Sequence, residues 1–238
     1  MTSPEPFGSD LRSNLIEGLQ AARAVEREIF AAMSPDERDG PDAEGGWSPK
    51  DVLAHLSAWR QHYADRMAAM RTGQATESTD ATEIDAINAT LHTERAAWTW
   101  ERVDTDADAT TEALIAEVAA ADGGAIADPK VVGTVMGDGP EHDLAHLGGI
   151  ARRVGLEVRV LDLADATQAS IEQGGWPSRP AAFARYNLAC FHALGGRLDR
   201  ARALLREALP VEEELRTLAP TDDDLIALRQ EIRTLLSG

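Results

Sequence analysis

Two histidines, His142 and His146, stand four residues apart in the segment EHDLAHLGGI. Residues i and i+4 of an α-helix project from the same face about one turn apart, so both imidazoles can reach one divalent ion. A third histidine, His55, lies in a second segment with a helical pattern, WSPKDVLAHLSAW. Three protein ligands leave coordination positions open for water or a substrate, as reactive metal sites require. The pattern therefore indicates a metal centre built from two helices.

Spacing alone leaves the third ligand open. His62 falls on the same side of its helix as His55, and His92 lies in the next helical segment, so either can take its place. A single H-x-x-x-H is also typical of ordinary histidines on the surface of an acidic helical protein. His192, near the C-terminus, is interpreted as a packing or surface residue.

Neutral imidazole is a good ligand for zinc, nickel, copper or iron. Glu141 and Asp143 flank His142, and either can orient an imidazole or move a proton. Other chemistry is less well supported, because the chain has no phosphate-binding G-x-x-x-x-G-K-[ST], no dinucleotide fingerprint behind a strand and no G-x-S-x-G. Cys190 and His192 are two residues apart, so on one helix they point apart, and Cys190 is expected to be a buried structural thiol.

Apolar residues recur at steps of three and four residues, a spacing that predicts helices with one buried face. These helices are expected over 11–33, 49–71, 84–103 and 110–120, and from a capping residue at 138 through the histidine pair to 154. Segments 34–46, 72–82 and 125–137 are expected to be loops, with Gly123 and Gly124 ending the helix before the last of them. A connecting helix over 157–173, a break at 174–180 and further helices over 181–236 complete the chain.

The composition limits the classes of protein to consider. Aromatic residues make up only 5% of the 238 residues, and alanine and leucine carry much of the apolar content, which favours helices. A formal charge of -18 argues against partners with phosphate backbones and against anionic membrane surfaces. With one cysteine there is no intramolecular disulfide. The start MTSPEPFGSD is unlike a signal peptide and no run is long enough to span a membrane, so a cytoplasmic protein is expected.

The order of motifs resembles the DinB-like superfamily. The motif W-S-x-K-D-V-L-x-H-L-x-x-W occupies 47–59, I-N follows at 87–88, and E-H-x-x-x-H-L occupies 141–147. The first of these is most similar to the ClbS/DfsB-like branch, and the resemblance covers about residues 8–155. It implies a four-helix bundle with a metal site formed by His55, His142 and His146. Members of the family include metal-dependent hydrolases and thiol-dependent transferases or isomerases, whereas the ClbS-like branch includes resistance proteins in which a metal is not central.

The C-terminal region resembles one tetratricopeptide unit, a helical hairpin with small and apolar residues at fixed positions. The matching positions are Leu188, Ala189, Gly195, Leu198, Ala201, Leu205 and Ala208. Since one repeat cannot bury its own apolar face, it is expected to pack on a neighbouring element. It then either extends the helical scaffold or docks a peptide.

These observations predict an all-α protein: a DinB-like helical bundle over 1–155, a connecting helix and linker over 156–176, and a TPR-like helical hairpin domain over 177–238. The expected function is that of a hydrolase or thiol-dependent transferase acting on a small electrophile, with zinc or nickel on His55, His142 and His146. A metal-independent ClbS-like resistance protein and a TPR-type interaction module are the alternatives. The expected partners are a small-molecule substrate and a peptide or protein on the C-terminal helices, with no nucleic acid and no membrane. A homodimer is compatible with the family, and no catalytic residue is assigned.

Overall fold

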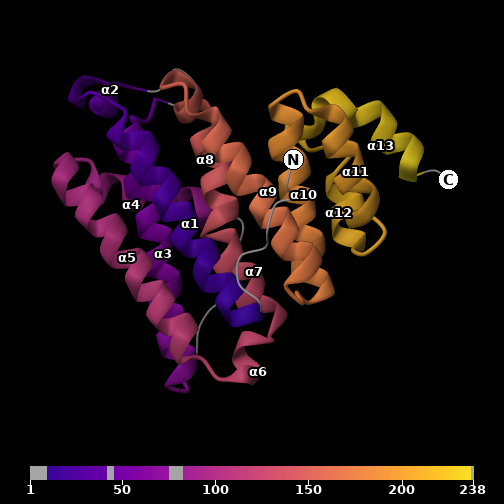
Figure 1. The fold of residues 1–238 in the computed structure, drawn as a ribbon, viewed down its shortest axis with the longest axis horizontal. Helices are drawn as coiled ribbons and strands as arrows, with labels where there is room; N and C mark the ends of the chain where they lie inside the picture. The colour runs from indigo at the N-terminus through magenta and orange to yellow at the C-terminus, as the bar shows by residue number, and fades with distance from the viewer. Residues whose placement is uncertain (1–9, 42–45, 75–82, 237–238) are drawn as a thin grey trace.

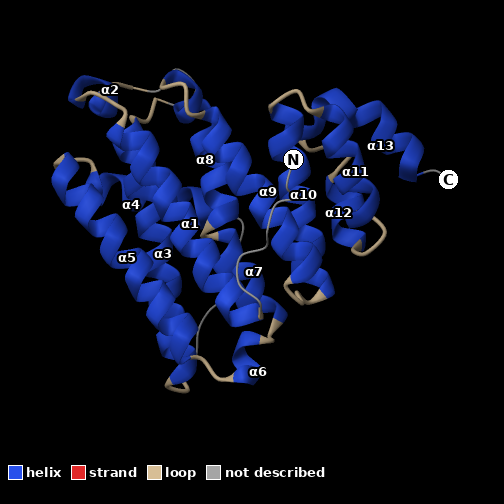
Figure 2. Ribbon diagram, viewed as in Figure 1, coloured by secondary structure: helices blue, strands red, loops and turns tan. Residues whose placement is uncertain are grey.

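The computed structural model describes residues 10–41, 46–74 and 83–236, and every regular element in these ranges is helical (Figure 2). The expected all-helical class is confirmed for this part of the chain. Two predictions fall outside the described residues: the unlikeness of the first nine residues to a signal peptide, and most of the loop expected over 72–82. The helices are α1 Leu11–Ala31, α2 Pro35–Asp39, α3 Pro49–Arg71, α4 Ile84–Arg95, α5 Trp100–Ala120, α6 Gly123–Ile126, α7 Pro129–Gly137, α8 Pro140–Arg153, α9 Glu157–Gln173, α10 Ser178–Leu194, α11 Leu198–Ala208, α12 Glu213–Leu218, the 3-10 helix η2 Asp223–Leu228 and α13 Arg229–Leu236.

Four of the longer helices, α1, α3, α5 and α8, pack around a shared apolar core (Figure 1). Helix α5 lies along both α3 and α1, and α8 packs against α1 and contacts α3. Each helix buries one face, as the three- and four-residue spacing predicts. The buried apolar residues include Leu15, Leu19 and Ile29 of α1, Leu53 and Leu56 of α3, Leu114 and Val118 of α5, and Leu147 and Ile150 of α8.

The start of α3 follows the predicted chemistry. The Ser48 hydroxyl accepts from the Asp51 backbone N–H at 3.1 Å, and Asp51 Oδ2 accepts from the Ser48 backbone N–H at 3.0 Å. This reciprocal capping box satisfies two donors that the first helical turn leaves unpaired, and Pro49 occupies the first position, where its missing N–H costs nothing. The beginning of the helix that carries His55 is therefore fixed by local sequence.

The helix expected over 84–103 is wrong, because α4 ends at Arg95 and α5 begins at Trp100 and runs continuously to Ala120. The hydroxyl of Thr99 caps the new helix by accepting from the Arg102 backbone N–H. The ring of Trp98 lies beneath the guanidinium groups of Arg95 and Arg102, at 5.0 and 3.9 Å from its centroid. Trp98, which fits the apolar helical pattern, therefore lies between the two helices and packs against the two arginines.

The loop expected over 125–137 is also wrong. It forms α6 and α7, and Gly123–Gly124 begin α6 instead of ending α5. Asp128 caps α7, which buries Val131, Val132, Val135 and Met136 against the core. Within the loop expected over 34–46, residues 35–39 form the short helix α2, which has its own capping box.

The sequence predicts Asp138 as the cap of α8, and this prediction is wrong. Gly139 is the cap residue and Pro140 follows it. A Cβ on Gly139 would lie 2.6 Å from Leu19 Cδ2 and 2.9 Å from the Val135 carbonyl oxygen. Only glycine lets the α7–α8 junction approach α1 this closely. The side chain of Asp138 is therefore available to the histidine cavity.

The C-terminal helices share the core of the preceding ones. Helix α9 packs against α1 and α8, and α10 packs against α7, α8, α9, α11 and η2. The buried indole N–H of Trp176 donates to Asn14 Oδ1 at 2.9 Å, which ties the segment before α10 to α1. The hairpin of α10 and α11 thus packs on neighbouring elements.

A buried network of charges joins α1, α3 and α8. Arg60 of α3 is 1% exposed and contacts Glu26 of α1 and Asp143 of α8, both fully buried, the latter at 2.7 Å. Arg23 contacts Glu26 at 3.1 Å and reaches Asp104 and Asp108 of α5. Arg60 binds carboxylates of two other helices, and Arg23 joins Glu26 of its own helix to Asp104 and Asp108 of α5. The network therefore fixes how these helices are placed relative to one another.

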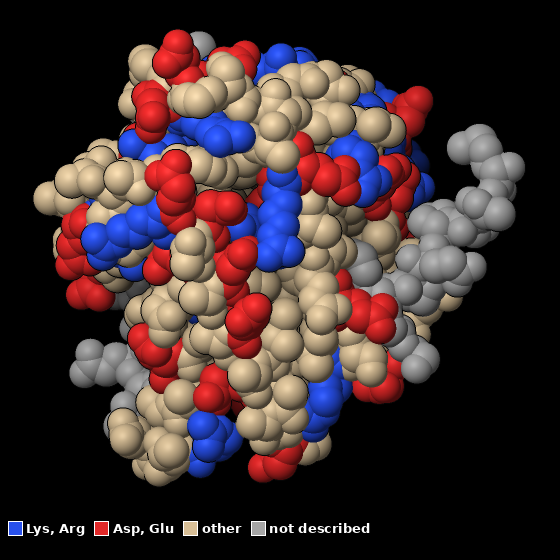
Figure 3. Space-filling view, turned by 60° about the vertical axis from the view of Figure 1, so that its left-hand side comes forward, with Lys and Arg blue, Asp and Glu red and all other residues tan. Residues whose placement is uncertain are grey.

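On the surface seen in Figure 3, acidic and basic side chains are interspersed. One exposed pair, Arg159 of α9 with Glu28 of α1 at 2.6 Å, links the C-terminal helices to the first helix. None of the helices in the described ranges has the length and apolar character needed to cross a membrane.

Replacing Arg60 by methionine is expected to lower the free energy of unfolding by about 3–5 kcal/mol, because Glu26 and Asp143 lose the charge that neutralises them. Arg159→Met, which removes the exposed pair with Glu28, is the matched control and is expected to cost less than about 1 kcal/mol. Urea unfolding followed by circular dichroism measures both. Equal losses in the two variants would show that the buried network does not hold the helices together.

Candidate metal centre

The three predicted histidines come together at one point. His55 projects from α3, and His142 and His146 project from successive turns of α8. Their ring centroids form a nearly equilateral triangle with sides of 4.8, 4.9 and 5.0 Å. The Nε2 atoms of His55 and His142 are 3.0 Å apart, and one nitrogen from each ring lies within 4.8 Å of the others. Two helices thus present three ring nitrogens to a single small volume.

The buried charge network sets this geometry. Arg60 lies on α3 five residues after His55, and its partner Asp143 is next to His142 in α8. The contact between Arg60 and Asp143 therefore holds the two histidine-bearing helices in register close to the site. The i, i+4 spacing on α8 then places His146 beside His142.

The surroundings of all three imidazoles favour the neutral form of the ring. Burial, with a smaller effect of His146, lowers the pKa of His55 to about 3. Burial, and then the neighbouring His146, His55 and Arg60, lower the pKa of His142 far below its usual value. Burial alone lowers the pKa of His146. Neutral imidazole is the form that binds metals, so a metal ion would not have to displace protons at neutral pH.

The hydrogen bonding of the rings fits a metal ion. Buried Nδ1 atoms of His55 and His142 have no hydrogen-bond partner among the described residues, and the Nε2 atoms of these two rings face each other. Without an ion, one Nε2 must carry a proton, which leaves the Nδ1 of that ring as an unpaired acceptor. An ion would take the lone pairs of both Nε2 atoms, and both Nδ1 atoms would then carry protons. Asp138 Oδ1, 3.9 Å from His142 Nδ1, lies on the side where such a proton would point.

A cavity of about 380 Å³ opens onto the histidines. Trp47 and Trp59 form its aromatic wall, and the Trp59 indole N–H donates to Asn88 Oδ1 at 2.9 Å. Burial, with the nearby Asp138, raises the pKa of Tyr63 to about 12, so its hydroxyl stays protonated. Burial and Glu141 raise the pKa of Asp138. The cavity thus combines apolar rings with two groups that can donate hydrogen bonds.

The other histidines do not join the cluster. His62 is exposed and lies beside the rings of Trp59 and Tyr63. His92 stacks on Trp47 with ring centroids 5.1 Å apart and lies 3.8 Å from Asp51. His192 is buried, and its Nδ1 accepts from Arg197 Nε at 3.0 Å, as a packing residue would. Tertiary packing therefore selects His55 from the candidates that spacing left open.

The two acids beside His142 bind elsewhere. Glu141 accepts from the Asn187 amide of α10 at 2.6 Å, and Asp143 binds Arg60. Sequence reasoning missed Asp138 and Tyr63, because Asp138 matched a helix cap and Tyr63 matched an apolar stripe, and it used Asn88 only as part of the I-N motif. No local signal identifies them, since their role depends on how α3, α4 and α8 meet.

Trp47 and Trp59 line this cavity, whereas Trp100 packs on Phe30 and Trp98 contacts arginines. Cys190 is buried, as expected, and its thiol faces Asp222 rather than a histidine. The thiol and the imidazole of His192 therefore form no catalytic pair.

Burial of neutral His55 predicts a loss of stability in acid. Its pKa of about 3 lies below the value near 6.5 of an unfolded chain, so between these values the unfolded state binds a proton that the native state does not. The stabilising contribution is complete above pH 6.5 and is lost as the pH falls. Between pH 7.5 and 4.5, the free energy of unfolding of the metal-free protein is expected to fall by about 2–3 kcal/mol more than that of His55→Asn, as measured by urea unfolding. Parallel pH profiles would show that His55 is not buried in its neutral form.

A family model for the DinB superfamily matches residues 19–151. This range is more than half of the chain and contains the three clustered histidines. Neither the curated proteins nor the solved structures contain a match to this sequence. The chain belongs to the DinB superfamily.

Proposed function

We propose that this protein is a metal-dependent enzyme that binds zinc or nickel through His55, His142 and His146 and acts on a small electrophile. The observation that carries the proposal is the convergence of three neutral imidazoles, with the Nε2 atoms of His55 and His142 3.0 Å apart. Three protein ligands on one side leave the cavity side of the site free for a substrate.

When bound, a divalent ion supplies a Lewis acid that makes a water or a thiol more nucleophilic at neutral pH. The indoles of Trp47 and Trp59 would exclude bulk water and bind the apolar part of a substrate. The Tyr63 hydroxyl would donate to a polar substrate atom, because its pKa of about 12 keeps it protonated. Asp138 would accept from His142 Nδ1 and orient that ring.

The reaction is proposed to be hydrolysis or a thiol-dependent transfer. In the second case the thiol must come from a second substrate, because Cys190 lies in another cavity. Its thiol hydrogen bonds to Asp222, and burial raises its pKa. A chain thiol that stays protonated is a poor nucleophile.

Protein purified without a histidine tag and loaded with zinc or nickel is expected to retain about one ion per chain. His142→Ala is expected to lose it, whereas His62→Ala and His92→Ala should keep it, since these two rings lie outside the cluster. Elemental analysis after gel filtration measures the metal, and circular dichroism checks folding. Full occupancy in both His142→Ala and His55→Ala, or none in the loaded wild type, would contradict the assignment.

A metal-independent resistance activity of the ClbS type is the competing proposal for the same cavity. A chromogenic ester reports hydrolysis, and a chloronitroarene with added thiol reports transfer. If the proposed metal function is right, activity on the responsive probe should fall at least about tenfold with a chelator and return with zinc or nickel. Activity that persists fully after chelation would instead favour the metal-independent alternative.

We also propose that α1, α3, α5 and α8 form the four-helix bundle of the family, and that α10 and α11 form a TPR-like hairpin. The packing of α10 on five neighbouring elements favours a scaffold role for this hairpin over peptide docking. The proposed division of the chain remains 1–155 for the bundle, 156–176 for the connection and 177–238 for the hairpin domain.

A further inference from the structure

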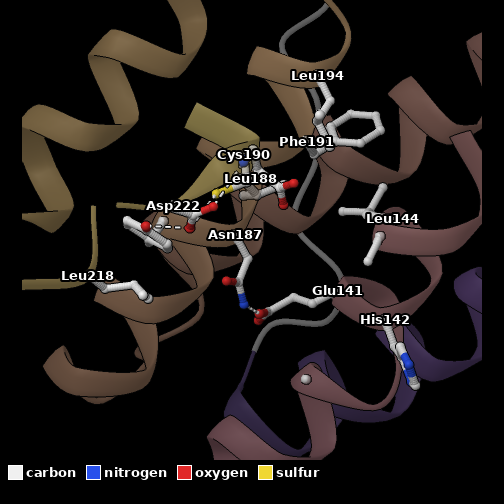
Figure 4. A pocket seen from close by; sticks show the side chains of 14 residues that line it. Glu141, His142, Leu144, Asn187, Leu188, Cys190, Phe191, Leu194, Leu218 and Asp222 are labelled. Atoms are coloured by element: carbon white, nitrogen blue, oxygen red, sulfur yellow. Dashed lines mark hydrogen bonds between the residues drawn. The ribbon is translucent and has the colours of Figure 1, made fainter. Parts of the chain in front are cut away.

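A second cavity, of about 410 Å³, lies between α8 and α10 and is closed by residues 218–224 (Figure 4). Its size is in the range of small-molecule sites. Glu141 and His142 of α8 line one part, and Asn187, Cys190 and Phe191 of α10 line the facing part. The family match ends at residue 151, so much of this wall comes from helices outside it.

The charges around the cavity are of one sign. The carboxylates of Asp222 and Asp224 line it, together with the carboxyl group of Glu141, whose pKa burial raises to about 7, and no lysine or arginine does. Within the described residues, no lysine or arginine nitrogen comes within 4.0 Å of these carboxylates. Burial, together with repulsion from Asp222 and Asp223, raises the pKa of Asp224. The guanidinium of Arg229 lies nearby, but it binds the Asp222 carbonyl oxygen at 3.2 Å and the Asp223 carboxylate at 3.0 Å and does not line the cavity.

The rest of the wall is apolar and partly uncovered. Leu144 and Phe191 lie on one side of the cavity (Figure 4). Leu194 and Leu218 also line it, yet they are 65% and 46% exposed, which places apolar surface at its opening. A ligand with an apolar body would remove this surface from water, which favours its binding.

A metal ion is the less favoured occupant, although Cys190, Asp222 and Asp224 lie close together. Asp222 Oδ2 already accepts from the Tyr186 hydroxyl at 2.6 Å and faces the Cys190 thiol at 3.8 Å. Burial, with the nearby Asp222, raises the pKa of the Cys190 thiol, so it keeps its proton and is a poor metal ligand. The remaining lining is hydrocarbon, which suits an organic ligand better than a hydrated ion.

We propose that this cavity binds a small primary ammonium ion with an apolar chain or ring, its charge against Asp222 and Asp224 and its apolar part along Leu218, Leu194 and Phe191. His142 lines both this cavity and the one that opens onto the other histidines. A bound amine would therefore lie next to the candidate metal centre. If the proposed function holds, this assigns amphipathic amines as the class of substrate or co-substrate.

Calorimetric titration of metal-free protein with n-butyl-, n-pentyl- and n-hexylammonium tests the proposal. Affinity is expected to rise about three- to fourfold with each added methylene. Hexanoate, which has the opposite charge on a similar chain, is expected to bind at least roughly tenfold more weakly than hexylammonium. Equal binding of hexanoate and hexylammonium, or no binding of any amine at millimolar concentration, would overturn the proposal.

Asp224→Asn and Asp223→Asn provide matched variants, since they remove the same charge from adjacent residues. Asp224 lines the cavity and is expected to contribute roughly three- to tenfold to hexylammonium affinity. Asp223 pairs with Arg229 at 3.0 Å outside the lining, so its variant should change affinity by less than about twofold. If the two substitutions changed the affinity equally, the amine would be bound only by general attraction to an acidic protein, and the proposed site would be contradicted.

His55→Ala separates this proposal from the metal function. His55 lines only the histidine cavity, so its loss should abolish metal binding and leave hexylammonium affinity within about twofold. Metal binding without amine binding in the wild type would refute the amine site alone. Amine binding in a protein that takes up no metal would refute the metal centre alone.

Discussion

The contact between Arg60 and Asp143 is the constraint on which the site depends. A guanidinium taken out of water must be neutralised, and Arg60 finds its counter-charges on two other helices, Glu26 of α1 and Asp143 of α8. Asp143 is the neighbour of His142, so satisfying one buried charge also determines how far α8 lies from α3 and from His55. Apolar packing alone would tolerate small sliding of these helices, whereas the directional ion pairs would not. The network therefore contributes to the alignment of the site as well as to the stability of the fold.

Burial acts on the acids and the bases of this region in opposite directions. It lowers the pKa of His55, His142 and His146, and it raises the pKa of Glu141 to about 7 and that of Asp143 and Asp138 above the usual range. The same low polarity thus favours neutral imidazoles beside the protonated forms of Glu141 and Asp138, whereas Asp143 keeps its charge against Arg60. The groups that line the histidine cavity therefore carry little charge, although the chain as a whole carries -18. A divalent cation would enter as the dominant charge in that cavity.

The sequence predicts some of this architecture because some of its causes are local. The i, i+4 pair on α8 and the capping box of α3 follow from helix geometry, and the resemblance of motifs selects His55. The causes of the remainder are not local. The break at Trp98 comes from two arginines that hold the ring, and Gly139 caps α8 because a side chain there would meet Leu19. Helix α7 is only nine residues long, too short for a periodic signal to distinguish it from a loop.

The C-terminal helices complete the surroundings of the site rather than merely following it. The Asn187 amide of α10 binds Glu141, the residue before His142 in α8. Phe191 of α10 lies close to Gly148 of α8. Helix α8 is thus held between two sets of contacts, Arg60 on the side of α3 and Asn187 on the side of α10. Because the family match stops at residue 151, the second set belongs to the part of the chain that the family pattern does not describe. Members of one superfamily can keep the same three histidines and still differ in what they bind, since different segments can build the wall that faces α8.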